Sequence, residues 1–222
     1  MKVTLTILSL FCIYNISNGQ KQLTTDEIFK YWTLDKTRNS NKSDGIQIMG
    51  SDTVLYQKTK QLIDSLHSSN IDSIIIYTIG LPGYFASGKC LTGSYPITSH
   101  IIWKMNNEVF TQMFEGKCSS KISKISNSEL FTFYDTNISV MMTETFMPRI
   151  YGAELSNNNV HFSMTFINHE PQYSILYKID RKFKSLNFTE SDLEDEKSLF
   201  HNHNLNLKGY TWWTMIKKEL NQ

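Results

Sequence analysis

The segment at residues 98–116, TSHIIWKMNNEVFTQMFEG, constrains the fold more than any other part of the chain. Side chains alternate in character on both sides of Asn106-Asn107, which is the pattern of two β-strands joined by a tight turn. Asparagine tolerates the positive φ that such a turn requires. In this register Trp103 lies opposite Phe110 as an aromatic cross-strand pair. The segment therefore predicts a β-hairpin.

Two cysteines flank this hairpin, Cys90 before it and Cys118 after it. In an oxidising compartment we expect them to form a disulfide bond. That bond would hold the loop before the hairpin against the hairpin's end, and its chain-entropy contribution is about 3–4 kcal/mol. Two buried free thiols are the alternative. A metal site is less favoured, because neither cysteine has another cysteine or histidine close by in the sequence.

The N-terminus has the three parts of a secretory signal peptide. Lys2 is followed by the mostly apolar residues 3–14, and small residues occupy the positions needed for a cut after Gly19. The apolar run is shorter than the ~20 residues of a membrane-spanning helix. We therefore expect residues 1–19 to be removed, leaving a secreted or periplasmic chain, residues 20–222, without an integral membrane segment. A buried N-terminal helix and an uncleaved anchor are the alternatives.

The charge of the chain excludes one class of partner. Lysine and arginine number 22 and aspartate and glutamate 21, and loss of Lys2 leaves 21 of each. A neutral surface has no excess charge with which to release counterions from a nucleic acid. The roughly 200 residues that remain are enough for a single core-bearing domain. Nucleic-acid binding is not expected.

A near match to a phosphate-binding loop occurs where Gly83 is followed after four residues by Gly88-Lys89. Cys90 stands where the Ser or Thr that binds Mg²⁺ belongs. Pro96, shortly afterwards, breaks the helix whose N-terminus would hold the phosphates. The sequence therefore argues against nucleotide binding, and no cofactor is predicted.

Helices are expected at the beginning of the mature chain. Thr24 with Glu27 is a capping box, and a helix is predicted from there to about Lys36. Asp52 caps a second helix with apolar residues at helical spacing. The apolar run at Ile74–Ile79 then predicts a strand.

Further strands and helices are expected after the first hairpin. Short strands are predicted at 138–142, and before the second helix at 46–48. The alternation at 162–166 and again at 173–179 predicts a second hairpin, with an exposed turn at Asn168-His169-Glu170-Pro171. Thr189 starts a helix, and a last helix is predicted at 207–220.

Helices at both ends with strands between them favour an α+β fold. We expect a mostly antiparallel sheet with helices packed on one face, in a single domain. The aromatic stripe of the last helix is expected to dock on that sheet.

Candidate catalytic residues are few. His201-Asn202-His203 is the one close histidine pair, and in a strand both imidazoles would share a face and could hold a metal with one carboxylate. The pair lies in an Asn-rich segment that we interpret as a turn between helices, where polar side chains cap and solvate. A metal-dependent hydrolase of the cell envelope that uses His201 and His203 is therefore the second hypothesis.

The first hypothesis is a non-catalytic binding domain. The loop from Pro82 to Pro96 carries Tyr84, Phe85 and Tyr95, whose rings could contact a partner. The partner would be an envelope protein, a peptide or a glycan. Alternatively, these rings cover the core beneath the loop.

The signal that ends at Gly19-Gln20, the composition rich in Asn, Lys, Ser and Ile, and the order strand, Cys90, hairpin, Cys118 resemble those of exported bacterial proteins of unknown function. The resemblance covers the signal closely and the rest of the chain loosely. It implies export and no catalytic residue.

Overall fold

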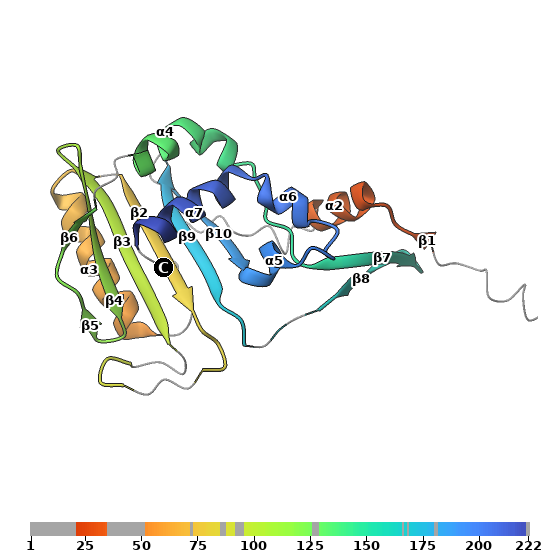
Figure 1. Cartoon of the computed structure of the whole chain (residues 1–222), viewed down its shortest axis with the longest axis horizontal. Coiled ribbons are helices and arrows are strands. Elements are labelled where there is room, and N and C mark those ends of the chain that lie inside the picture. Colours follow the sequence, from red (N-terminus) through yellow and green to blue (C-terminus); the bar gives the residue numbers. More distant parts are fainter. Residues whose placement is uncertain are drawn as a thin grey trace, which may run out of the picture.

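The structure is a computed structural model that describes residues 21–34, 52–71, 73–84, 88–91, 96–125, 129–165, 167, 169–179 and 182–220. The predicted signal peptide and the predicted strand at 46–48 lie outside the described residues. Figure 1 shows a large sheet with helices packed against it, and a smaller sheet at the other end of the molecule.

The large sheet has seven strands in the order β10-β9-β2-β3-β4-β5, with β6 also paired to β4. All of these pairs are antiparallel. The strands are β2 (Ile74–Gly80), β3 (Ile97–Met105), β4 (Glu108–Glu115), β5 (Cys118–Ser119), β6 (Ser123–Ile125), β9 (Gln172–Ile179) and β10 (Lys182–Thr189). The predicted α+β fold with a mostly antiparallel sheet is confirmed.

The predicted hairpin is the β3–β4 pair. Asn106 and Asn107 form its turn with φ values of 51° and 62°, and Trp103 faces Phe110 with ring centroids 5.9 Å apart. The Cys90–Cys118 disulfide is present, with Cα atoms 5.1 Å apart. It holds the loop before β3 against the β4–β5 turn.

Helices cover both faces of the large sheet, not one face as predicted. Side chains alternate between faces along a strand, so neighbouring residues of β2 enter different cores. Ile74 and Ile76 pack with α3 (Thr53–Ser68), whereas Ile75 and Tyr77 pack with α4 (Glu129–Met141) and α7 (Lys208–Glu219). The continuously apolar β2 is what a strand buried on both faces requires.

Helix α4 replaces the strand predicted at 138–142. Its buried residues Leu130, Phe131, Tyr134 and Met141 recur at helical spacing and join the core beneath α7. The ring of Tyr134 stacks on Trp212 of α7 with centroids 5.2 Å apart. This packing on α7 outweighs the β-propensity of the branched and aromatic residues in the segment.

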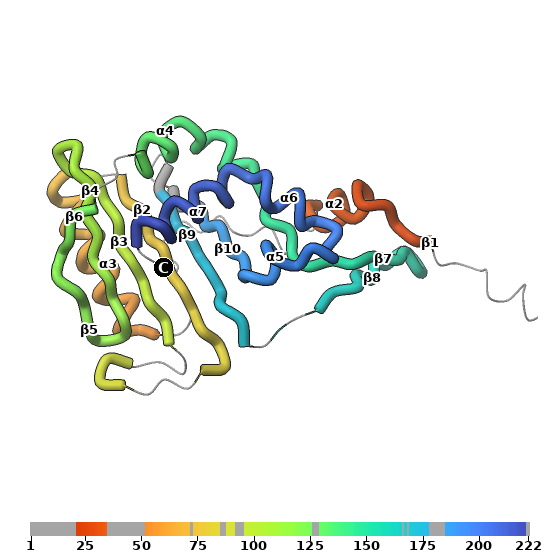
Figure 2. The backbone as a smooth tube through the Cα atoms, in the orientation of Figure 1, coloured from red at the N-terminus to blue at the C-terminus, as the bar shows by residue number. Residues whose placement is uncertain are grey.

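The predicted second hairpin is also wrong, because its two arms belong to different sheets. Strand β8 (Asn159–Met164) pairs with β7 (Ile150–Ser156), and β9 pairs with β2 and β10. The turn between β7 and β8 is Asn157-Asn158, with φ values of 51° and 62°. Figure 2 follows the chain out of the large sheet through β7 and β8 and back into it at β9.

The small sheet has the order β1-β7-β8, where β1 is Lys21–Gln22. Its core contains residues from β7 and β8, from α2 (Thr25–Leu34) and from Phe200, which precedes α6 (His201–Leu205). The predicted capping box starts α2: the Thr24 amide donates to Glu27 at 2.9 Å, and the Glu27 amide donates to the Thr24 hydroxyl at 3.3 Å.

The other predicted helix starts are confirmed as well. Oδ1 of Asp52 accepts from the Val54 and Leu55 amides at 3.0 and 2.9 Å at the start of α3. Thr189 forms a capping box with Asp192 at the start of α5 (Glu190–Glu194). The last helix, predicted at 207–220, is α7.

Candidate functional site

A pocket of about 530 Å³ opens on the α4/α7 face of the large sheet. Its floor comes from β3 and β4, one wall from β6 and the segment before it, and the other wall from the end of α7, which lies in front of the sheet in Figure 1. The lining residues are His100, Thr111, Met113, Ser120, Ser123, Lys124, Ile125, Lys218, Glu219 and Leu220. The volume is that of an ordinary ligand site.

His100 supplies a buried imidazole to the floor. It lies between Tyr77 of β2 and Met113 of β4 in the sheet register, and His100 is only 6% exposed. Burial lowers the pKa of His100 to about 4, since a charged imidazole loses its hydration there. At neutral pH the ring is therefore uncharged and offers one hydrogen-bond donor and one acceptor.

Thr111 supplies a hydroxyl group. It pairs with Ile102 of β3 on one side and Ser123 of β6 on the other. Its Oγ1 is buried and has no hydrogen-bond partner within the described part of the chain. Rotation about χ1 moves the hydroxyl between staggered positions, so the group can turn toward a molecule in the pocket.

The rim carries two ammonium groups and one carboxylate. Lys124 Nζ lies 2.5 Å from Oε1 of Glu108 and keeps two further N–H donors. Lys218, in the last turn of α7, makes no hydrogen bond or ion pair with the residues that the structure describes. Glu219 is the carboxylate. The rim therefore carries more ammonium groups than carboxylates.

Sequence reasoning missed this pocket. The predicted cross-strand pair of Trp103 and Phe110 lies on the face of the hairpin that packs with α3, and the pocket lies on the other face of the same strands. On that other face His100 and Thr111 are polar residues that are buried beside the core residues Ile102 and Val109. Two polar residues in line with buried ones were the available signal, but the walls come from segments more than ninety residues apart.

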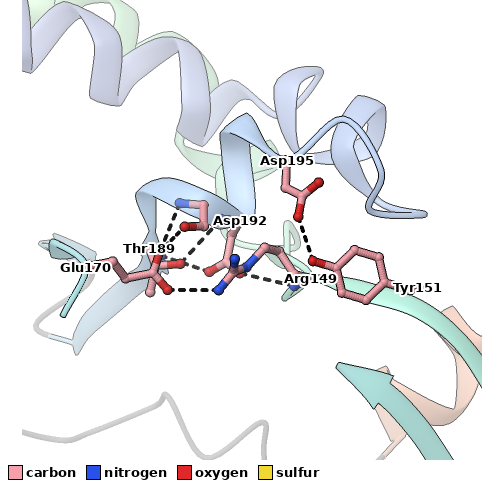
Figure 3. Close-up of polar contacts among 7 residues, drawn as sticks. Arg149, Tyr151, Glu170, Thr189, Asp192 and Asp195 are labelled. Carbon is pink, nitrogen blue, oxygen red and sulfur yellow. Dashed lines mark hydrogen bonds and ion pairs between the residues drawn. The ribbon is translucent and has the colours of Figure 1, made fainter. Parts of the chain in front are cut away.

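A second polar cluster joins the two sheets, and Figure 3 shows its side chains. Nη2 of Arg149 donates to Oε1 of Glu170 at 3.1 Å, with both side chains almost fully buried. Oε2 of Glu170 accepts from the amide and the hydroxyl of Ser191 at the start of α5. The prediction of an exposed turn at His169-Glu170 is therefore wrong for Glu170, although His169 is exposed.

Asp192 and Asp195 complete the cluster. Asp192 accepts from the Arg149 amide at 3.1 Å and from the Thr189 amide at 2.8 Å, and burial raises its pKa. The Tyr151 hydroxyl donates to Asp195 at 2.6 Å, and this bond lowers the pKa of the Asp195 carboxyl. These partners hold the start of β7 against α5 and β9, so we assign the cluster to structure and not to ligand binding.

The two histidines of the hydrolase hypothesis lie on α6, a short helix where we expected a turn. Residues two apart on a helix point in directions about 200° apart, so His201 and His203 do not share a face. Nε2 of His203 lies 3.1 Å from the Thr145 carbonyl oxygen, and its ring packs on Phe29 with centroids 5.2 Å apart. Among the described residues no group of three or more His, Cys, Asp or Glu side chains could hold a metal ion.

The proposed partner loop is described only in part. Tyr84 is 55% exposed, so its ring does not cover the core. Phe85 and Tyr95 lie outside the described residues. Gly83 has a φ of 82°, and the His169 ring occupies the space that a Cβ there would need. The loop thus contacts the segment before β9, and the role of its aromatic residues stays a prediction.

Across the ranges that the structure describes, no helix has the length and apolarity needed to cross a membrane. Comparison of the chain with models of protein families, with curated proteins and with solved structures gives no significant match.

Proposed function

We propose that this protein is an exported binding domain whose ligand occupies the pocket between β3, β4, β6 and the end of α7. The observation that carries the proposal is the buried, unpartnered hydroxyl of Thr111 in the floor of a polar pocket. A buried polar group without a partner costs about 1–3 kcal/mol. Such groups are rare in native proteins, and a ligand that hydrogen-bonds to Thr111 would remove the cost.

Binding is favoured over acid–base catalysis by the state of His100. A general base is most effective when its pKa lies near the working pH. The pKa of His100 is lowered to about 4, so the imidazole is a weak base at neutral pH.

Export is the second part of the proposal. The sequence of residues 1–19 has the form of a signal peptide. The Cys90–Cys118 disulfide is of the kind that persists in a periplasm or outside the cell. Mass spectrometry of the native protein tests this part: a chain beginning at Gln20 with no free thiol supports it, and an intact Met1 with alkylatable Cys90 and Cys118 contradicts it.

The pocket is tested by nuclear magnetic resonance. We expect that, when ¹⁵N-labelled residues 20–222 are mixed in turn with short peptides, oligosaccharides and small polar acids, one class shifts the amide signals of His100, Thr111 and Ser123. Ser123→Tyr should abolish the shifts, because Ser123 is exposed and lines the pocket. Ser119→Tyr is the matched control, since Ser119 is also an exposed strand serine but does not line the pocket. Shifts confined to other surfaces, or unchanged by Ser123→Tyr, would refute the pocket.

A further inference from the structure

We propose that the ligand of this pocket carries a carboxylate, which is held between Lys218 and the hydroxyl-bearing floor. This inference rests on the proposed function, because it names the chemistry of that same site. The chemistry is shared by two sources, the C-terminal carboxylate of a peptide and a free small organic acid.

The rim favours an anion. A lysine ammonium is a donor only, and the pocket has two of them, Lys124 and Lys218, against one carboxylate, Glu219. Lys218 has no partner among the described residues. Lys124 uses one N–H of its ammonium group for the ion pair with Glu108, and its other two N–H groups can donate to a ligand. The charge of Lys124 is balanced by Glu108, so Lys218 is the ammonium group of the lining that has no counter-charge among the described residues, and it would repel a cationic ligand and attract an anionic one.

The floor is compatible with the same group. A carboxylate accepts several hydrogen bonds and donates none. The hydroxyls of Thr111 and Ser123 lie opposite each other on β4 and β6, and each can donate. The other hydroxyl in the lining is already used: Ser120 Oγ accepts from the Met113 amide at 3.0 Å and donates to the Lys121 carbonyl at 2.9 Å. Thr111 and Ser123 are therefore the hydroxyls that can serve a ligand.

The position of Glu219 limits the ligand to one carboxylate. The first carboxylate can pair with Lys218, but a second one would find no unpaired ammonium group among the described lining residues, because Lys124 is paired with Glu108, and Glu219 would repel it. We therefore expect a single carboxylate on a short polar ligand, with the rest of the ligand in the open part of the pocket.

The test uses calorimetric and resonance titrations of residues 20–222 with three probes. They are N-acetyl-Ala-Ala as the free acid, the same peptide as its C-terminal amide, and acetate. We expect the free acid to bind about tenfold more tightly than the amide, and its affinity to fall as salt rises. Lys218→Gln should weaken the free acid at least about threefold. Lys208→Gln is the control, because Lys208 is an exposed lysine at the other end of α7, outside the pocket.

The outcomes separate the inference from the proposed function. Acetate that binds in a Lys218-dependent manner when the peptide acid does not would assign the carboxylate to a small organic acid. Equal affinity for acid and amide, or an unchanged affinity in Lys218→Gln, overturns the inference, but shifts at Thr111 would still support the pocket. Failure of all three probes at millimolar concentration also overturns the inference. Binding that Ser123→Tyr leaves intact overturns the pocket itself.

Discussion

Arg149 and Glu170 form a buried ion pair, with Nη2 of the arginine 3.1 Å from Oε1 of the glutamate, at the junction of the two sheets. Arg149 is the residue before β7, and Glu170 lies two residues before β9. The ion pair therefore holds together the points where the chain enters the small sheet and where it returns to the large one. The second oxygen of Glu170 is bound by Ser191 of α5. Three segments therefore depend on one carboxylate.

Glu170→Gln should destabilise the protein by about 3–5 kcal/mol, because it leaves the Arg149 guanidinium buried without a counter-charge. The free energy of unfolding in urea measures this loss. Lys60→Gln is the comparison, since it breaks the exposed Lys60–Asp64 pair of α3, whose atoms are 2.5 Å apart but whose side chains are about half exposed. We expect little measurable change there. Equal losses in the two variants would show that the buried pair has no special role.

A substitution of Asn204 tests the same junction between the two sheets. It is fully buried; its Nδ2 donates to the carbonyl oxygens of Met147 and Asp192 at 2.7 and 2.8 Å, and its Oδ1 accepts from the Met147 amide at 2.9 Å. Asn204→Ala leaves these backbone groups buried without a hydrogen-bond partner, and we expect the free energy of unfolding to fall by at least about 2 kcal/mol. Asn206→Ala should lose less than about 0.5 kcal/mol, since the Asn206 side chain is exposed and, among the described residues, bonds only to the Asn202 carbonyl oxygen. Thermal unfolding of the two variants decides the prediction.

Reduction of the Cys90–Cys118 bond should lower the free energy of unfolding by about 3–4 kcal/mol, because the unfolded chain regains the entropy of a closed loop. Urea unfolding with and without dithiothreitol measures the change. The double variant Cys90→Ser, Cys118→Ser should match the reduced protein and show no response to dithiothreitol. A wild-type midpoint unaffected by the reductant, with both thiols verified as free, would contradict the prediction.

Acid should destabilise the protein through His100. Its pKa is near 6.5 when unfolded and about 4 when folded, so between these values the unfolded chain binds more protons. The stabilising contribution is therefore complete above pH 6.5 and is lost as the pH falls through the folded pKa, a change of about 3 kcal/mol. His100→Gln should flatten the dependence of unfolding free energy on pH across this window.

The pKa of Asp192 acts with the opposite sign. It is raised by burial, so the folded state holds that proton more tightly and the contribution of Asp192 is lost as the pH rises through its folded pKa. The contribution of Asp192 is the same in wild type and in His100→Gln, so the difference between their pH profiles isolates His100. Parallel profiles would show that His100 does not titrate as its burial requires.

The local elements of the fold could be predicted because a few neighbouring residues determine them. Asn106-Asn107 permits the positive φ of a tight turn, and Thr189 with Asp192 satisfies the free amides at the start of α5. The disulfide followed from an even pair of cysteines beside that hairpin. The same local logic failed for β8, because alternation sets which side chains share a face and says nothing of which strand becomes the neighbour.

The candidate site could not be predicted, because its walls are distant in sequence. His100 and Thr111 belong to the hairpin that the sequence predicts, but the pocket forms only where β6 and the end of α7 stand beside that hairpin. The residues near the end of α7 in the sequence do not indicate where on the sheet the helix ends. Glu170 shows the same limit: a turn rich in polar residues is normally exposed, and only Arg149, brought from β7, makes its burial favourable.

By itself, then, the sequence determined the α+β class, the first hairpin with its cross-link, and the starts of α2, α3, α5 and α7, since each depends on backbone and side-chain preferences within a few residues. Tertiary structure alone decided that helices cover both faces of the large sheet, that β8 and β9 belong to different sheets, and that polar groups of β3 and β4 face a pocket. The physical reason is that burial and strand pairing are settled between segments far apart in the chain, where each contact depends on all the others.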